Sequence, residues 1–223
     1  LGIEVCLWGS FYVISMLKYN RYWADRLLEN LKADSIKVAV LVMNAGSKMN
    51  AEFARNYRVE IVLKDGRLLL IRSIRPDDKT ALADAFGHMS KESIHSRFLT
   101  DKKELAEREL AYLTELDFIH HVGLVAIIPE IDPERIVGIV RYILINQESA
   151  KRLAEVALVV VDQYQAKGIG TALLKHIAMI AGKAGVSTFE AYVLWENLHI
   201  RELFEHCGYQ IHSEIEGDLL KLF

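Results

Sequence analysis

Residues Ala154 to Gly170 read AEVALVVVDQYQAKGIG, and we expect the rest of the chain to be organised around this stretch. From Val156 to Val161 the run is continuously apolar and largely β-branched, which predicts a central strand covered on both faces. Asp162 to Lys167 is polar and predicts a turn. Gly168 and Gly170 would let the backbone approach a ligand closely, and a helical pattern follows them. The apolar stripe of this helix comprises Ile169, Ala172, Leu173, Ile177, Ile180 and Ala184.

The predicted helix start is a candidate anion site, because its first N–H groups lack partners and the helix dipole is positive there. Phosphate is the obvious ligand, although a tight turn with glycine at its bend explains the pattern equally well. A Walker A loop is excluded because Thr171 follows Gly170 with no lysine. A dinucleotide fingerprint would need glycine where Leu173 stands, so it is a weak alternative despite an acid, Glu190, at a suitable distance.

The composition is that of an ordinary globular protein. With 223 residues, 52% of them hydrophobic, the chain can bury a full core, most simply as one domain with an appended segment. A net charge of -3 gives no basic field for nucleic acid, and a cationic partner is more compatible. Cys6 and Cys207 show no metal or redox spacing, which favours a reducing cytoplasm. Val5 to Leu17 is too short for a membrane span, and Glu4 argues against a secretory signal.

Two parts of the chain are expected, residues 1–55 and residues 56–223. The first is rich in aromatic residues and could be a helical arm that packs on the main domain or on a second subunit. Alternatively, the chain begins upstream of its natural start, since it opens with Leu1 and has Met43 and Met49 just before the regular pattern. The sequence does not decide between these interpretations.

Regular patterns begin near Tyr57 with a predicted hairpin around Asp65-Gly66. Pro76 ends its second strand, and Asp77-Asp78 then stand where a helix cap belongs. Ser90 is a second predicted cap. The predicted helices run to about Phe86, from Ser90 to about Arg97, and from Lys102 to Leu116.

The second half predicts a β-α-β unit flanked by antiparallel strands. The turn with Pro129 and Pro133 is short enough to join an antiparallel pair, and Gly185 is a predicted C-terminal cap of the central helix. The predicted elements are strands at 122–128, 136–145, 153–161 and 187–194, a helix at 197–206 closed by Gly208, and two strands within 209–223.

This order of elements, with Gln165-Ala166-Lys167-Gly168-Ile169-Gly170 at the turn, resembles the GNAT N-acetyltransferase superfamily from about Gly66 to Phe223. The hexapeptide matches the acetyl-CoA motif Q/R-x-x-G-x-G/A of that family at every defined position. IRSIRPDDKTALADAFGHMSKESIHSRFL and AEVALVV are similar to the catalytic domain of bacterial Pat-type protein lysine acetyltransferases. Nothing resembles an acyl-CoA synthetase module or a cyclic-nucleotide domain, so we expect a stand-alone relative.

The resemblance implies a mixed α/β fold. It implies a twisted, mostly antiparallel sheet with helices on both faces, whose central β-α-β unit is splayed to admit acetyl-CoA. The turn would wrap the CoA pyrophosphate with backbone N–H groups, and the pantetheine arm would lie beside the strand before it like an extra strand. The residues assigned to acetyl-CoA, as co-substrate, are Leu158, Val159, Val160, Val161, Gln165, Ala166, Lys167, Gly168, Ile169, Gly170, Thr171 and Asn197. Asn197 could equally be a helix cap.

Glu155 is the candidate general base, because the Ala-Glu-Val context carries the base in related lysine acetyltransferases and a protonated amine cannot attack a thioester. Alternatively, Glu155 is a solvated strand-end carboxylate or pairs with Arg152 or Arg141. N–H groups near Val159 could polarise the thioester carbonyl.

The general acid is unassigned. Many relatives have tyrosine seven residues after the asparagine, where this chain has Phe204, so water or Tyr209 could reprotonate the thiolate.

No metal site is predicted among the eight histidines. His120 and His121 would face opposite sides of a strand. His95, His176, His199 and His206 are interpreted as surface residues of helices.

The leading hypothesis is therefore an acetyl-CoA-dependent N-acetyltransferase that transfers acetyl directly to an amine, preferably a protein lysine, in the cytoplasm. The alternatives are a small-molecule amine as acceptor, such as a polyamine, amino acid or antibiotic, and a non-catalytic acyl-CoA sensor or adaptor. No nucleic acid or membrane partner is expected, and a homo-oligomer could form through the N-terminal arm.

Overall fold

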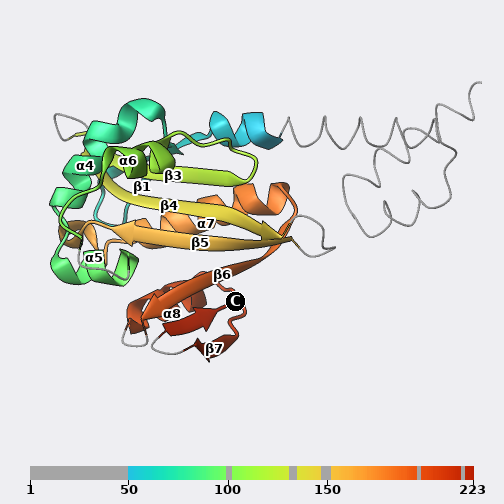
Figure 1. Cartoon of the computed structure of the whole chain (residues 1–223). Helices are drawn as coiled ribbons and strands as arrows, with labels where there is room; N and C mark the ends of the chain where they lie inside the picture. The colour runs from blue at the N-terminus through green and yellow to red at the C-terminus, as the bar shows by residue number, and fades with distance from the viewer. Residues whose placement is uncertain (1–49, 99–101, 131–134, 147–151, 195–196, 217–218) are drawn as a thin grey trace, which may run out of the picture. The chain divides into compact units, whose positions relative to one another are not determined.

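Eight strands form one sheet in the order β1-β2-β3-β4-β5-β6-β8-β7 (Figure 1). The computed structural model describes residues 50–98, 102–130, 135–146, 152–194, 197–216 and 219–223. All neighbouring pairs are antiparallel except β5 and β6, so the expected sheet and its single β-α-β unit are confirmed. The strands are β1 (Arg58–Val62), β2 (Leu68–Ser73), β3 (His121–Ile128), β4 (Arg135–Asn146), β5 (Arg152–Val160), β6 (Val186–Leu194), β7 (Ser213–Glu216) and β8 (Leu219–Leu222).

Helices cover both faces of the sheet. On β4, a Cβ added at Gly138 would lie 3.0 Å from Leu173 of α7, whereas the next residue, Ile139, lines a pocket with residues of α4, α5 and α6. Because successive side chains of a strand point to opposite faces, α7 lies on one face and the other three helices lie on the other. The helices are α4 (Lys79–Gly87), α5 (Lys91–Phe98), α6 (Glu107–Thr114), α7 (Ile169–Lys183) and α8 (Leu198–His206).

The first hairpin forms as predicted. Gly66 adopts φ 86°, and the N–H of Leu63 donates to the carbonyl of Arg67 over 2.8 Å. A left-handed backbone at this position favours glycine, which explains the Asp-Gly signal.

Asp78 is the N-cap residue of α4, as the sequence suggested, but its side chain makes no capping hydrogen bond to this helix. Its two carboxylate oxygens accept hydrogen bonds of 2.7 Å each from the guanidinium of Arg72, and one also accepts from the N–H of Arg75. Residues Pro76–Asp78 form a 3-10 turn that brings the carboxylate back to β2. A buried arginine in the sheet needs a countercharge, and the Asp78 carboxylate therefore pairs with Arg72 and does not cap the N–H groups of α4.

The predicted helix from Lys102 to Leu116 was too long. Helix α6 begins after Ala106, whose backbone is extended and whose N–H donates to the carboxylate of Glu109 over 2.9 Å. This capping interaction fixes the start one turn later than the apolar stripe indicated. The stripe was misleading because Leu105 and Leu116 contact the core from the segments that flank the helix.

Residues 50–55 are helical and pack against the sheet domain. Ala54 is 2% exposed, and its carbonyl accepts a hydrogen bond from the hydroxyl of Ser73. Nearby, the hydroxyl of Tyr57 lies 2.5 Å from Nδ1 of His176 on α7. The aromatic and apolar segments noted within residues 1–49 lie outside the described residues.

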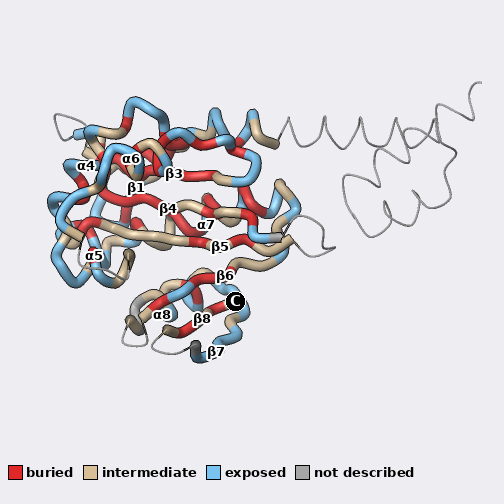
Figure 2. The backbone as a smooth tube through the Cα atoms, in the orientation of Figure 1, coloured by how far each residue is buried: buried red, intermediate tan, exposed pale blue. Residues whose placement is uncertain are grey.

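The core lies between the helices and the central strands (Figure 2). Helix α7 contributes a wider apolar face than its predicted stripe, because Leu174 and Ala181 are also buried. Within the part of the chain that is described, no helix is both long and apolar enough to cross a membrane.

Candidate active site

The two parallel strands of the β-α-β unit begin side by side and then diverge (Figure 1). The pairing of β5 with β6 runs from Arg152 to Glu155, and beyond it β6 pairs with β8. Residues Val156 to Val160 therefore pair only with β4 among the described strands. The expectation of a strand covered on both faces was wrong for this part, since Ala157, Leu158, Val159 and Val160 are all only half-buried. The free edge of β5 lies next to the glycine turn.

The turn between β5 and α7 has the backbone that its glycines suggested. Gly168 adopts φ 85° at the N-cap of α7, and Ala166 is also left-handed with φ 56°. No side chain caps the first N–H groups of α7, so they are available to an anion. A Cβ at Gly170 would meet Leu158 and Leu203 at ordinary contact distances of 3.5 to 3.6 Å. Only Gly168 is therefore required by its backbone conformation.

Gln165 and Lys167 hold the turn in shape. The amide Nε2 of Gln165 donates to the carbonyl of Val160 over 3.0 Å and to the hydroxyl of Ser93 over 3.2 Å. The ammonium of Lys167 donates to the carbonyl of Gln163 over 2.5 Å and lies 5.3 Å from the centre of the Tyr164 ring. Both side chains are thus tied to the turn itself, in addition to any role with a ligand.

Asp162 joins this turn to α5, a link that the sequence analysis missed. Its carboxylate accepts hydrogen bonds from the N–H and hydroxyl of Ser90, over 2.8 and 2.6 Å, and from the hydroxyl of Ser93 over 2.8 Å. Partial burial opposes ionisation, but these hydrogen bonds outweigh it and lower the pKa of Asp162. The predicted cap is also present, since the N–H of Ser93 donates to the Ser90 hydroxyl over 3.1 Å.

Glu155 lies at the last residue pair before the strands separate. It is half-buried and pairs with Ile143 of β4 and Glu190 of β6. Its side chain is on the face of the sheet that carries α4, α5 and α6, as are those of Ala157 and Val159. The alternative of an ion pair with Arg141 is not observed among the described residues. Arg152 donates from Nη1 to the carbonyl of Ala184 over 2.7 Å.

Glu190 is a structural acid. It is 5% exposed, accepts a hydrogen bond from the hydroxyl of Tyr192, and lies 3.2 Å from the ammonium of Lys221 on β8. In a dinucleotide site, Glu190 would have to bind a ribose hydroxyl. Its carboxylate instead binds Tyr192 and Lys221, so the residue that supported the dinucleotide alternative has a structural role. The charge within an otherwise apolar strand was the sequence signal for a buried pair.

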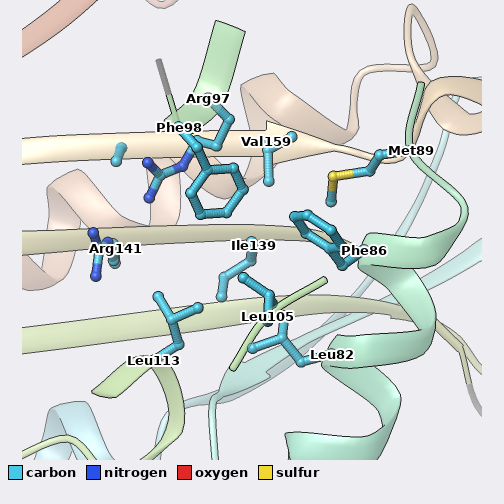
Figure 3. A pocket seen from close by; sticks show the side chains of 11 residues that line it. Leu82, Phe86, Met89, Arg97, Phe98, Leu105, Leu113, Ile139, Arg141 and Val159 are labelled. Carbon is cyan, nitrogen blue, oxygen red and sulfur yellow. The ribbon is translucent and has the colours of Figure 1, made fainter. Parts of the chain in front are cut away.

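A pocket opens on the same face of the sheet as Glu155 (Figure 3). Its wall is mostly apolar and comes from α4, α5, α6 and the segment before α6, and β4 and β5 supply its base. Two arginines, Arg97 and Arg141, also line it. The full lining comprises Leu82, Phe86, Met89, Arg97, Phe98, Leu105, Leu113, Ile139, Arg141, Ala157 and Val159.

The electrostatics around the pocket are dominated by these two arginines. Burial, followed by repulsion from Arg141, lowers the pKa of Arg97 to about 10, and attraction to Glu155 opposes this shift. Burial and the charge of Arg141 also lower the pKa of His121 to about 4. The ring of Tyr112 lies 5.2 Å from the guanidinium carbon of Arg141 and 5.1 Å from the His121 ring. Of these residues, Arg141 was considered from the sequence only as a possible ion-pair partner of Glu155, and none was predicted to line a pocket.

Helix α8 begins at the position where the sequence placed Asn197. Asn197 is the N-cap residue, but its side chain makes no capping hydrogen bond. Leu203 of α8 lies next to Gly170, so this helix flanks the glycine turn. Phe204 is buried in the core at 9% exposure and has no proton to donate. Tyr209 is 39% exposed, and partial burial followed by the nearby Cys207 raises the pKa of its hydroxyl.

Histidines do not form a metal site in the described part of the chain, where no group of three or more His, Cys, Asp or Glu side chains could hold an ion. His176 is half-buried against Tyr57, so its interpretation as a surface residue was wrong. The side chain of His199 lies outside the described residues.

Comparison with known proteins gives a consistent result. The model of the Acetyltransferase (GNAT) family matches residues 91–209, which include the glycine turn, Glu155 and both pocket arginines. The acetyltransferase PA5475 of Pseudomonas aeruginosa is 32% identical over 123 residues, covering 55% of this chain and 64% of that protein. The acetyltransferase Pat of Mycolicibacterium smegmatis is 27% identical over 150 residues, covering 67% of this chain and 44% of that protein.

The fold also has a close counterpart among solved structures. The GNAT domain of PAT from S. lividans superposes with a TM-score of 0.68 and 32% identity, covering 74% of this chain and 94% of that domain. The match thus spans less than two thirds of each of the two relatives above, and nearly all of this isolated domain.

Proposed function

Because the chain belongs to the GNAT family of acetyltransferases, we propose that it transfers an acetyl group from acetyl-CoA directly to the side-chain amine of a protein lysine. The observation that carries this proposal is the unpaired edge of β5 beside an uncapped helix start. An extended pantetheine arm needs backbone partners along one edge, and a pyrophosphate needs clustered N–H groups. The chain provides both within residues 156–171.

Glu155 would act as the general base. The acceptor amine, protonated at neutral pH, gives a proton to Glu155, directly or through water, and its lone pair then attacks the carbonyl carbon of the thioester. The carbon–sulfur bond breaks, the attacking nitrogen loses its second proton to become the amide, and CoA leaves as a thiolate that takes up one proton. The position of Glu155, half-buried and directly before the free edge of β5, supports this role. Backbone N–H groups near Val159 would polarise the carbonyl.

Tyr209 is the side chain that we propose as proton donor to the thiolate. It replaces the tyrosine that is absent at Phe204. Like any tyrosine hydroxyl, that of Tyr209 is protonated at neutral pH and so carries a proton that the thiolate can take up.

The choice of lysine as acceptor rests on the similarity to proteins named Pat. A small-molecule amine is the second candidate. The two widely spaced cysteines, of which Cys207 is a free thiol, favour activity in a reducing compartment such as the cytoplasm.

The proposal is tested in two steps. First, acetyl-CoA should raise the melting temperature of the protein, and NAD and ATP should not, because only a ligand of the native state stabilises it. Second, release of free thiol should be measured with lysine-containing proteins and with a panel of polyamines and amino acids. Acetyl-CoA binding without thiol release from any amine would indicate a sensor, and stabilisation by NAD alone would refute the acetyltransferase assignment.

A further inference from the structure

The pocket beside Glu155 places two positive charges in an apolar surrounding. Figure 3 shows the guanidinium groups of Arg97 and Arg141 toward the same end of the pocket, while Met89 and Phe86 lie at the other end. The two groups are close enough for their repulsion to be significant. Like charges brought together out of water are unfavourable unless an anion lies between or beside them.

Two hydrogen-bond donors of Arg141 are unsatisfied within the part of the chain that the structure describes. These are its Nε and Nη1 atoms, which are buried and have no hydrogen-bond partner there. The Tyr112 ring lies against the guanidinium but offers no acceptor to these two atoms. Nε2 of His121, whose ring is close enough to Arg141 to be affected by its charge, is also buried without a partner among the described residues. Buried guanidinium donors are rarely left unsatisfied, so a missing acceptor for Arg141 is indicated.

Arg97 is also without a countercharge at contact distance in the described regions of the chain. It approaches the ring of Phe98, with the guanidinium carbon 5.1 Å from the ring centre, and no ion pair of Arg97 is found there. Glu155 attracts it, although other effects on its pKa are larger. A protonated amine would be repelled from this end of the pocket, which argues that an anionic group and not the acceptor amine belongs there.

We propose that Arg97 and Arg141 form a carboxylate-binding site in the pocket beside Glu155. A carboxylate is planar and can accept two hydrogen bonds from one guanidinium, which matches the unsatisfied donors of Arg141. This site is distinct from the glycine turn, where a pyrophosphate would bind.

The inference rests on the proposed function, because the carboxylate must be carried by one of the two substrates. One source is the acyl donor, since Ala157 and Val159 line the pocket and lie where the thioester is proposed to bind. An acyl group with a terminal carboxylate would extend from there toward Arg141. The other source is the acceptor, if an acidic group stands next to the amine.

The first arm of the test measures binding of acyl donors. Succinyl-CoA and butyryl-CoA have acyl chains of equal length and differ in the terminal carboxylate. Titration calorimetry with the wild-type protein should show succinyl-CoA binding on the order of tenfold more tightly than butyryl-CoA if the donor carries the anion. Arg141→Gln and Arg97→Gln should each abolish this preference and leave acetyl-CoA binding unchanged.

The second arm measures acceptors with acetyl-CoA as donor. Two lysine peptides that differ only in Asp or Asn beside the lysine should be acetylated with kcat/KM values that differ on the order of tenfold if the acceptor carries the anion. Arg141→Gln and Arg97→Gln should each make the kcat/KM values of the two peptides equal.

Two further variants control the test. Arg135 lies on the same strand as Arg141 but pairs with Asp84, with 3.5 Å between Nε and Oδ2, so Arg135→Gln should preserve either preference. Arg141→Lys keeps a positive charge and should retain part of the preference for the substrate with the carboxylate. This variant covers the case that Arg141→Gln does not fold. If acetyl-CoA binds but neither preference exists in the wild type, the carboxylate site is refuted alone. If no acyl-CoA binds, the proposed function is refuted with it.

Discussion

Glu155 and Glu190 pair with each other across the last residue position that joins β5 to β6. The two carboxylates nevertheless have different surroundings. Glu190 is buried, with Tyr192 and Lys221 as partners, whereas no ion pair of Glu155 is found among the described residues. Glu190 is therefore satisfied by partners within the sheet, whereas Glu155 is the acid that we propose to act on a substrate.

Replacing Glu155 with Gln should lower kcat by about 10²- to 10⁴-fold, the usual contribution of a general base. The shape of the side chain is kept, so stabilisation by acetyl-CoA in thermal unfolding should be unchanged. The effect would be measured as the initial rate of thiol release with a single acceptor at saturating concentration. Turnover equal to that of the wild type would remove Glu155 from the mechanism.

Replacing Glu190 with Gln should affect folding more than chemistry. The variant replaces the buried carboxylate that contacts the Lys221 ammonium and the Tyr192 hydroxyl by a neutral amide, so we expect a loss of about 1–3 kcal/mol of unfolding free energy. Urea unfolding would measure it. A fully stable variant would contradict the structural role assigned to this acid.

Alanine substitutions at three glycines should distinguish a glycine that its backbone conformation requires from glycines where a side chain can be accommodated. Gly168→Ala should cost about 1–2 kcal/mol and weaken acetyl-CoA binding, because φ is 85° there. Gly170→Ala should be tolerated in both respects, since the new methyl group would lie 3.5 Å from its nearest neighbour. Gly182→Ala, in the last turn of α7, should be neutral or stabilise by up to about 1 kcal/mol. Equal effects at Gly168 and Gly170 would show that the turn has been misinterpreted.

Asp78→Asn should be one of the most destabilising changes in the domain. Asp78 and Arg72 are each only 9% exposed at the side chain, and the substitution leaves a buried guanidinium without its countercharge. We expect a loss of about 3–5 kcal/mol, measured by urea unfolding. The matched control is Glu60→Gln, whose partner Arg58 is 55% exposed and which should change stability by less than about 1 kcal/mol.

His121 should make the protein less stable in mild acid. Its pKa is lowered to about 4 in the native state and returns toward about 6.5 on unfolding. Between these values the unfolded chain binds more protons, so the free energy of unfolding falls as the pH decreases from about 6.5 to 4 and is unaffected by this group above 7. Thermal unfolding across this range should show the loss, and His121→Gln should reduce it. An unchanged pH slope in the variant would assign the effect to other groups.

Much of the fold followed from local signals in the sequence. Asp65-Gly66 predicted the hairpin, and Gly168 predicted the turn between strand and helix. Both signals are local, because a left-handed backbone conformation favours glycine at that one position. The boundaries of α6 were wrong because the Glu109 cap outweighed the apolar stripe. Asp78 does stand at the N-cap of α4, but the sequence did not indicate that its carboxylate would pair with Arg72 of β2.

Apart from Asn197 and Tyr209, the candidate site was predicted along a single strand and turn. Residues 155–171 are contiguous, so their order in the chain already places them together. Arg97 and Arg141 come from α5 and β4, and only the packing of that helix over the sheet brings both into one pocket. No pattern in the sequence records such a contact between distant elements.

The hydrogen bonds from Ser90 and Ser93 to Asp162 have a consequence for the order in which substrates are handled. They connect the start of α5 to the loop that precedes the glycine turn, and Gln165 adds a further hydrogen bond to the hydroxyl of Ser93. Helix α5 carries Arg97 into the pocket. A donor that binds to the turn would therefore restrain one wall of the pocket, and by reciprocity a ligand that orders this wall would increase the affinity for the donor.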